Sequence, residues 1–414
     1  MIPIQIEADS VKRSTQTDPH SAGVLFQFIR DGKPWTRADL VTATGFARPT
    51  VAARIDELLK AQLLVPAGEA SSTGGRPPAT FVFNPGVGLI LSADLGATHG
   101  RLAITDLAAN VITESSIEIA IEAGPETVLD LVTQKLLSML EELGRPVADV
   151  FGVGVGLPGP VEHGAGRPMS PPIMPGWDGF DVPSYVQRTV DVPILVDNDV
   201  NIMALGEHRA RWSSVQDLVF IKVATGIGAG IIIDGELRRG DDGAAGDLGH
   251  IAVPGGRPVP CRCGNEGCLE ALASGHAVVE ALREQGYEIE RTAELVELVR
   301  SGNTTAMHAV RQAGRDIGRV AASCVNLLNP SVIVIGGMVS DVGEHLLAGI
   351  REVVYSRSLP LATQNLRIVV SKSAGRAGVL GAAQMVIQET LAPPAINRLL
   401  ATGNSPVPLA QASS

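Results

Sequence analysis

The sequence predicts a two-lobed α/β body preceded by a small helical domain that ends in a β-hairpin. Residues 21–64 carry apolar side chains at helical spacing, in short segments separated by Gly and Pro. Near Pro85 the pattern changes to buried strands that alternate with helices. Two strand pairs, over residues 87–107 and 217–237, each turn on a Gly-rich loop and open one α/β half. Two such halves that face each other are expected to form a cleft.

Length and composition limit the class of protein. A chain of 414 residues is too long for one compact core, so two or three domains are expected. The sequence has no apolar run of membrane-spanning length and no secretory signal, and its clustered cysteines suit a reducing compartment, so we expect a cytoplasmic protein with no membrane partner. The net charge of −11 argues against a nucleic-acid binder that uses its whole surface. Residues 1–85 are close to neutral, however, with nine Lys or Arg against eight Asp or Glu, which leaves room for a local basic face.

Four segments are expected. Residues 1–19 form a flexible arm, and residues 20–85 form a winged helix-turn-helix domain. Residues 86–391 form the two-lobed body, and residues 392–414 form a disordered tail that contains Pro and Ser.

The N-terminal domain is expected to hold three helices and a wing. The first helix starts at Ser21, and its inner face carries Val24, Leu25, Phe28 and Ile29. Thr36 caps the second helix, with Asp39 three residues on as in a capping box. Gly45 makes the turn to a third helix that begins at Arg48. A Gly-rich hairpin tip follows and enters a strand.

The exposed side of the third helix is a candidate DNA-reading surface. Short side chains near its start would let the backbone enter a major groove, where Arg48, Thr50 and Arg54 could contact bases or phosphates. Arg76, in the hairpin tip, could enter the adjacent minor groove. The alternative is a protein-interaction domain with a solvated helix face.

Three of the four cysteines fall in one short loop, Cys261, Cys263 and Cys268, with His250 upstream. Three thiolates and one imidazole are a donor set that Zn²⁺ takes in tetrahedral structural sites. The alternative is three reduced thiols in a surface loop. A closed metal loop would bring His250, Asp247 and Glu270 to one locality.

The two Gly-rich turns could hold the phosphates of ATP. Around the first turn lie a carboxylate, a glycine and a hydroxyl, and the carboxylate could carry a hydrated Mg²⁺: Asp94, Gly96 and Thr98. Around the second turn lie Thr225, Gly226 and Gly228. Gly336 and Gly337 end a later strand, where adenosine could lie against the backbone.

Asp199 ends a buried strand and heads a helix, which is a suitable place for a general base that takes a proton from a hydroxyl attacking a γ-phosphate. Asn198 could fix that hydroxyl. The alternative is that Asp199 only caps the helix. Together with Asp247, His250 and Glu270, these groups offer donors and acceptors to the vicinal hydroxyls of a sugar.

The body resembles the ROK family of repressors, open reading frames and sugar kinases. The matching segments run in order from residue 88 to about 390: DLGAT, GVGLPGPV, VDNDVN, ATGIGAGI, AAGDLGHI, CRCGNEGCLE and VIGGMVS. The resemblance implies an actin-like ATPase (ribonuclease H-like) fold and Zn²⁺ held by His250, Cys261, Cys263 and Cys268. It also implies sugar contacts from Asn198, Asp199, His250 and Glu270, and a homodimer or homotetramer. The N-terminal winged helix resembles that of the family's regulators.

Three positions depart from the family's kinases. Ala97 stands where they carry a second Gly, Asp247 where they carry Glu, and Ala224 where their phosphate loop begins with Gly. These changes weigh against phosphate transfer more than against sugar binding.

Two functions are therefore expected, in order of preference. The first is a sugar-responsive regulator of carbohydrate genes, most simply a repressor, which binds a double-stranded operator and a sugar or sugar phosphate. The second is an ATP-dependent hexose or N-acetylhexosamine kinase, similar to glucokinase, with Asp199 as base. One chain can also combine both.

Overall fold

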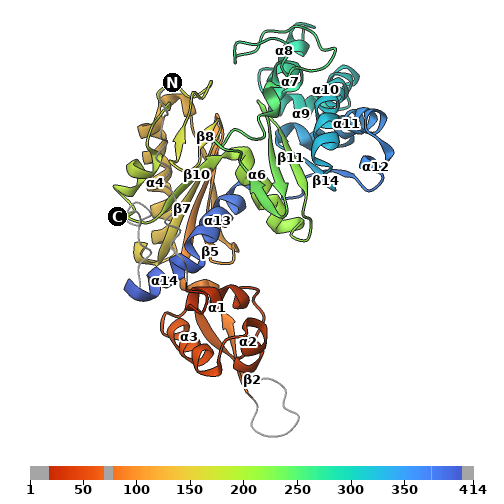
Figure 1. Ribbon diagram of the computed structural model, residues 1–414. Coiled ribbons are helices and arrows are strands. Elements are labelled where there is room, and N and C mark those ends of the chain that lie inside the picture. The colour runs from red at the N-terminus through yellow and green to blue at the C-terminus, as the bar shows by residue number, and fades with distance from the viewer. Residues whose placement is uncertain (1–17, 70–77, 374, 403–414) are drawn as a thin grey trace, which may run out of the picture. The chain divides into compact units, whose positions relative to one another are not determined.

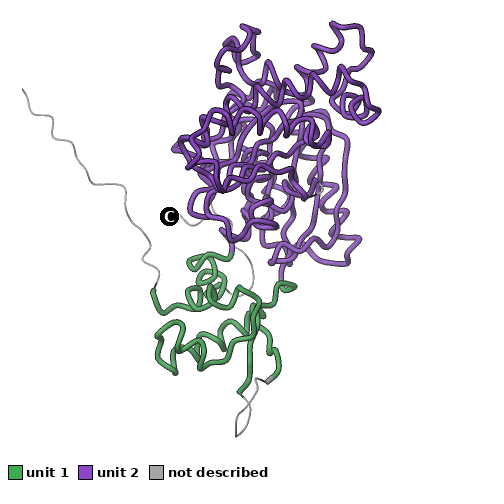
Figure 2. Tube along the Cα trace, turned by 90° about the vertical axis from the view of Figure 1, so that its right-hand side faces the viewer, with its two compact units in different colours: residues 1–87, 391–405 green, residues 88–390, 406–414 purple. Residues whose placement is uncertain are grey.

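The computed structural model describes residues 18–69, 78–373 and 375–402. The chain divides into two compact units (Figures 1 and 2). One unit contains the chain up to Val87 together with the segment that begins at Leu391, and the other contains Gly88–Thr390. No helix within the described ranges is both long and apolar enough to cross a membrane.

The first unit contains a helix-turn-helix. Its helices are α1 (Ala22–Ile29), α2 (Arg37–Thr44) and α3 (Arg48–Lys60). The expected cap of α2 forms, because the Thr36 hydroxyl accepts the Asp39 N–H while the Asp39 carboxylate accepts the Thr36 N–H. Gly45 ends α2 in the left-handed region, at φ 71°, which a residue without Cβ adopts without strain.

One inward residue of α1 was predicted wrongly. Phe28 is exposed, whereas Phe26 is fully buried and meets the ring of Phe83 edge to face. Ala22, Leu25, Phe26 and Ile29 form a single i, i+3, i+4, i+7 stripe, and Phe28 lies off that stripe.

Three strands complete the wing, in the order β1-β3-β2: β1 (Trp35–Thr36), β2 (Leu64–Glu69) and β3 (Ala79–Phe83). The hairpin of β2 and β3 is antiparallel, and its tip, with Arg76, lies outside the described residues.

The expectation of disorder from residue 392 is wrong for ten residues. Helix α14 (Pro393–Thr402) packs on α1, where it buries Ile396 and Leu399. The Gln27 side chain donates to the Leu391 carbonyl at 2.8 Å, and the Gly23 N–H donates to the Asn397 side chain at 2.9 Å. The C-terminal segment is therefore part of the N-terminal unit.

The second unit contains two sheets of five strands with the same strand arrangement (Figure 1). The first has the order β10-β7-β4-β5-β6: β4 (Leu89–Leu95), β5 (His99–Asp106), β6 (Val111–Glu118), β7 (Val150–Leu157) and β10 (Ile194–Asn198). The second has the order β13-β12-β11-β14-β15: β11 (Leu218–Val223), β12 (Ile227–Ile233), β13 (Glu236–Arg238), β14 (Val332–Gly336) and β15 (Arg367–Val370). In each sheet three antiparallel strands are followed by two parallel ones.

The expected α/β halves are therefore confirmed, each opening with a strand, a Gly-rich turn and an antiparallel strand. A short ribbon, β8 (Val161–Glu162) and β9 (Arg167–Pro168), adds to the first half. The helices of this unit are α4 (Pro125–Glu142), α5 (Val182–Gln187), α6 (Asp199–Arg211), α7 (Leu269–Ala273), α8 (Gly275–Arg283), α9 (Thr292–Arg300), α10 (Thr304–Leu328), α11 (Glu344–Arg357), α12 (Pro360–Thr363) and α13 (Ala377–Thr390).

Helices α6 and α13 join the two halves. Helix α6 follows β10 of the first sheet but packs on β11 and β12 of the second, while α13 follows β15 but packs on β4 and β7. The two helices lie against each other (Figure 1), and glycines lie at their contact. A Cβ on Gly381 would lie 1.6 Å from the Ile202 carbonyl oxygen, and one on Gly206 would lie 1.9 Å from that of Ala377. Only glycine permits this backbone contact.

Candidate functional site

The predicted metal ligands come together. The ligand atoms of His250, Cys261, Cys263 and Cys268 all lie within 4.8 Å of one another. His250 ends a 3₁₀ turn (Leu248–His250), and Cys268 is the residue before α7. The Cys261 Sγ lies 3.6 Å from His250 Nδ1, and the Cys263 Sγ lies 3.7 Å from the Cys268 Sγ.

These distances suit zinc. Tetrahedral Zn²⁺ with usual bond lengths separates two sulfurs by about 3.8 Å and a sulfur from an imidazole nitrogen by about 3.6 Å. The backbone N–H of Asn265 lowers the pKa of Cys263 to about 7, whereas burial raises the pKa of Cys268 to about 12. The first thiol is thus a ready ligand near neutral pH, and the second would lose its proton on binding metal.

The metal loop is built against the second Gly-rich turn. Gly249 has no room for a side chain, since a Cβ there would lie 2.2 Å from the Ile227 carbonyl oxygen. The Gly275 N–H donates to the Ala224 carbonyl at 2.7 Å. Two residues beyond Cys268, the carboxylate of Glu270 accepts the Ile227 N–H at 3.1 Å. The loop therefore carries Glu270 to the turn that contains Thr225 and Gly226.

His250 offers two ring nitrogens, and only one of them is needed to bind a metal. Its Nδ1 faces the cysteines, so metal binding through Nδ1 leaves Nε2 to donate or accept elsewhere. Asp247 is exposed at the start of the same 3₁₀ turn.

Asn198, rather than Asp199, caps α6. Its Oδ1 accepts the N–H groups of Val200 and Asn201 at 2.9 and 3.3 Å, and its Nδ2 donates to the Gly159 carbonyl at 2.8 Å. Asn198 therefore ties the helix start to the loop after β7. Asp199 is the first residue of the helix and is almost fully buried.

Sequence reasoning missed the partner of Asp199. Lys222, on β11, pairs with the Asp199 carboxylate through its ammonium. Although burial acts to lower it, Asp199 and Asp94 raise the pKa of Lys222 above its ordinary value, so this side chain stays charged. One lysine in the otherwise apolar strand LVFIKV was the available signal.

Asp94 lies in the same charged group at the end of β4. Burial raises its pKa to about 7; Lys222 and Arg101 act in the lowering direction, and Asp199 in the raising direction. Its carboxylate also fills the space beside Gly378 at the start of α13, where a Cβ would lie 1.9 Å from Oδ2. A Mg²⁺ ion at Asp94 would therefore meet an ammonium, so the residues present do not suit this ion.

The other predicted phosphate-site residues occupy the turns and strand ends. Gly96 donates its N–H to the His99 carbonyl at 2.8 Å and so closes the first turn, and Thr98 is exposed on it. Gly228 lies on β12 directly beside Lys222 on β11. Gly336 ends β14 on the other side of Lys222, and Gly337 follows at φ 83°.

A second acid, Asp197, was not predicted. Its buried carboxylate accepts from Arg239 Nε at 2.6 Å, from Asn201 Nδ2 at 2.8 Å and from the Asn198 N–H at 2.8 Å. His163 Nδ1 lies 3.5 Å away. The network holds the Arg239 loop against the strand end that carries Asn198.

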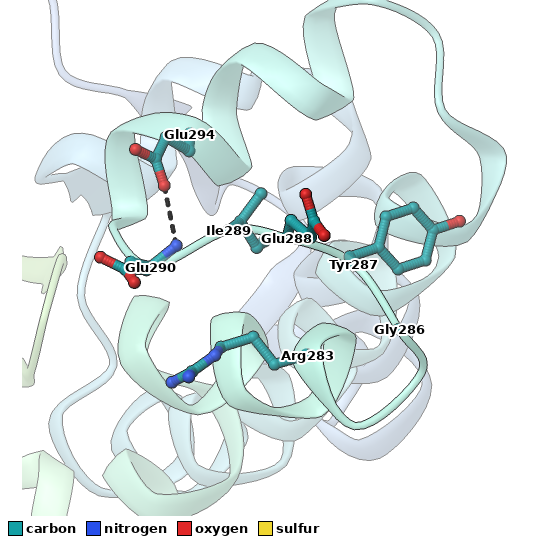
Figure 3. Close-up of a pocket in the computed structure, with 7 residues that line it drawn as sticks. All are labelled: Arg283, Gly286, Tyr287, Glu288, Ile289, Glu290 and Glu294. Carbon is teal, nitrogen blue, oxygen red and sulfur yellow. Dashed lines mark hydrogen bonds between the residues drawn. The ribbon is translucent and has the colours of Figure 1, made fainter.

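An open hollow elsewhere in the body lies beside the segment that joins α8 to α9 (Figure 3). Its acid Glu294 accepts the N–H groups of Glu290 and Arg291 at 2.7 and 3.1 Å and so serves the start of α9. None of the predicted site residues lines this hollow.

The candidate DNA-reading residues differ in exposure and in the contacts that their side chains make. Arg48 is exposed at the first turn of α3, and Thr50 is half-buried. Arg54 is held within the unit, because it pairs with Glu57 at 2.8 Å and Asp18 at 3.7 Å and donates to the His20 carbonyl at 3.0 Å.

Comparison with known proteins assigns the body to a family. A model of the ROK family matches residues 90–389. The chain belongs to the ROK family.

Relatives of this ROK protein include both regulators and kinases. It is 32% identical to the xylose repressor of Caldicellulosiruptor bescii over 385 residues, which cover 90% of this chain and 96% of that protein. A crystal structure of a ROK transcriptional regulator, a homologue of the E. coli Mlc protein, matches with TM-score 0.78 and 27% identity over 92% of this chain and 98% of that one.

A ROK glucokinase from Streptomyces griseus, in complex with glucose and AMPPNP, matches with TM-score 0.63 and 28% identity. It covers 72% of this chain and 99% of its own. The fold is thus that of ROK repressors and sugar kinases, and the regulator match extends further along this chain than the kinase match.

Proposed function

We propose that this ROK protein is a sugar-responsive transcriptional repressor. The observation that carries the proposal is that one chain joins a winged helix-turn-helix unit to a ROK body. The kinase match covers 72% of the chain, whereas the repressor and regulator matches cover 90% and 92%. A chain whose main task is phosphate transfer has no need of the additional unit.

The proposed effector is a neutral monosaccharide, and D-xylose is the first candidate because the 32% identical relative is named a xylose repressor. Asp199, Asp247, Glu270 and the Nε2 of His250 would contact its hydroxyls. Asn198 and Asp197 would hold the start of α6 in position. Zn²⁺ on His250, Cys261, Cys263 and Cys268 would supply a rigid closed loop rather than a chemical step.

The proposed DNA contacts come from α3 and the wing, with Arg48, Thr50 and Arg76 as candidates and Arg54 in a mainly supporting role. A homo-oligomer would present two such units to the two halves of an operator. Sugar binding need change the free energy of operator binding by only about 1–3 kcal/mol to alter affinity roughly 5–150-fold.

The test is selection of binding sites from random double-stranded DNA by the full chain, followed by gel shifts at near-physiological salt. We expect a defined sequence to be enriched and bound far more tightly than its scrambled version. A thermal-shift panel of pentoses, hexoses and their phosphates then identifies the effector. Binding with no sequence preference would refute the proposal.

ATP-dependent sugar phosphorylation remains the second candidate, favoured by the likeness to a glucokinase with bound glucose and AMPPNP. Asp199 would be its base, and ATP would lie on the two Gly-rich turns. The pairing of Asp199 with Lys222 weighs against it.

A further inference from the structure

A half-buried lysine lies at the point where the two sheets meet. Lys222 is near the end of β11, the central strand of the second sheet, while Asp94 and Asp199 come from the strand ends of the first sheet. The ammonium pairs directly with Asp199, and it acts on Asp94 through its charge.

The lateral neighbours of Lys222 in the sheet are glycines, and the space beside them is filled by Phe220 and by Val200 at the start of α6. In register, Lys222 lies between Gly228 on β12 and Gly336 on β14, so neither lateral neighbour has a side chain. Residues that lie side by side on adjacent strands share one face of a sheet. Because Val200 belongs to α6, this face of the sheet is the one that the start of α6 covers, and the Lys222 ammonium reaches Asp199 in the first turn of that helix.

The position would be unfavourable for a lone cation. The start of a helix carries a partial positive charge, which repels an ammonium. Burial adds a further cost for any unpaired charge. The ion pair with Asp199 compensates for both effects. Each of the two charged groups therefore stabilises the other in this position.

Two carboxylates that converge from different elements are also a usual setting for Mg²⁺, which requires oxygen ligands and keeps several waters. Here the Lys222 ammonium lies where such an ion would bind, and it pairs with Oδ2 of Asp199. A metal ion that binds this carboxylate oxygen of Asp199 would have to displace the Lys222 ammonium. We infer that Lys222 takes the place of the divalent cation at this site, so that the chain binds its sugar without Mg²⁺ and without phosphate transfer.

The inference rests on the proposed sugar site, but its test uses neither sugar nor DNA. Zinc-loaded full chain is titrated with MnCl₂ alone at pH 8, and bound Mn²⁺ is measured from the loss of the free-ion signal in electron paramagnetic resonance. Wild type and the matched control Lys135→Met, which removes a lysine from α4, should bind no Mn²⁺ at this site. Lys222→Met should bind one ion per chain, with an affinity at least about tenfold above any that wild type shows, because a positive charge has been removed between two carboxylates.

Adding Asp94→Asn to Lys222→Met should abolish the gained site. The inference is overturned if wild type binds Mn²⁺ as tightly as Lys222→Met, or if Asp94→Asn has no effect on the gain. Unchanged zinc content confirms that the variants fold, and Lys222→Gln, which keeps a polar side chain, serves if Lys222→Met does not.

A second measurement compares wild type with Asp199→Asn, a variant that keeps Lys222. Wild type is expected to release no ADP from ATP and Mg²⁺ with D-xylose or D-glucose. Magnesium-dependent ADP release that Asp199→Asn abolishes would also overturn the inference. Neither Mn²⁺ binding nor ADP release depends on operator binding, so the proposed repressor role is tested separately.

Discussion

Asp94 shows how a charged residue can reduce stability. Its pKa is about 7 in the folded chain against an ordinary value of 3.8, and the main cause is burial. Between these two pH values the folded state holds a proton that the unfolded state has lost. The free energy of unfolding therefore falls as the pH rises through this window, and the deficit is complete above about pH 7.

Asp94→Asn should remove this deficit. We expect the variant to be more stable than wild type by about 2–4 kcal/mol at pH 8, with no gain at pH 4, because each pKa unit corresponds to about 1.4 kcal/mol. Thermal unfolding at the two pH values checks this, with the exposed Asp191→Asn as control. An equal loss of stability at both pH values would contradict the assignment.

The two candidate DNA-reading arginines of α3, Arg48 and Arg54, should differ in what their loss affects. Arg48→Ala should weaken operator binding by about 1–3 kcal/mol, as loss of one base contact does, and leave the unfolding temperature unchanged. Arg54→Ala should lower the stability of its unit by up to about 1 kcal/mol, because it loses partly exposed ion pairs. Operator titrations and thermal unfolding of both variants make the comparison. A larger affinity loss for Arg54→Ala without loss of stability would reverse their roles.

At the scale of residues, the sequence predicted those interactions whose partners lie close together in the chain. Thr36 and Asp39 form their capping box, and the four metal ligands fall within 19 residues of one another. It did not reveal Lys222 with Asp199, or Asp197 with Arg239, because those pairs join strands that only the folded sheets bring together.

At the scale of elements, α14 is the feature that sequence reasoning missed. The Pro and Ser content of the tail suggested disorder, yet proline is favoured in the first turn of a helix. Ile396 and Leu399, three residues apart, form the buried stripe. Helix α1 and this C-terminal helix therefore share one core.

Ile396→Asp should disrupt that core, because it buries an unpaired carboxylate against α1. We expect a loss of several kcal/mol in the stability of the first unit and a loss of operator binding, with sugar affinity unchanged. Operator titration and sugar calorimetry on the same preparation check this. Ala401→Asp, at an exposed position of the same helix, is the control, and full operator binding by Ile396→Asp would show that α14 is dispensable.

At the scale of the whole molecule, the repeat of strand, Gly-rich turn and strand was enough to predict two α/β halves. The equal strand orders of the two sheets follow from that repeat. The exchange of α6 and α13 between the halves could not be predicted, because it depends on glycine contacts between residues far apart in sequence. Helix α6 begins with Asp199 of the proposed sugar site, and α13 packs against it.

The central claim is that a metal-held sugar site reports its occupancy to an operator. It is tested most directly by fluorescence anisotropy of a labelled operator, titrated with the zinc-loaded full chain with and without the effector sugar. We expect the sugar to change operator affinity between about 5- and 150-fold in wild type. In Cys263→Ser we expect operator binding without sugar to persist and the sugar response to disappear. An undiminished sugar response in Cys263→Ser, or no response of wild type to any sugar, would contradict the account.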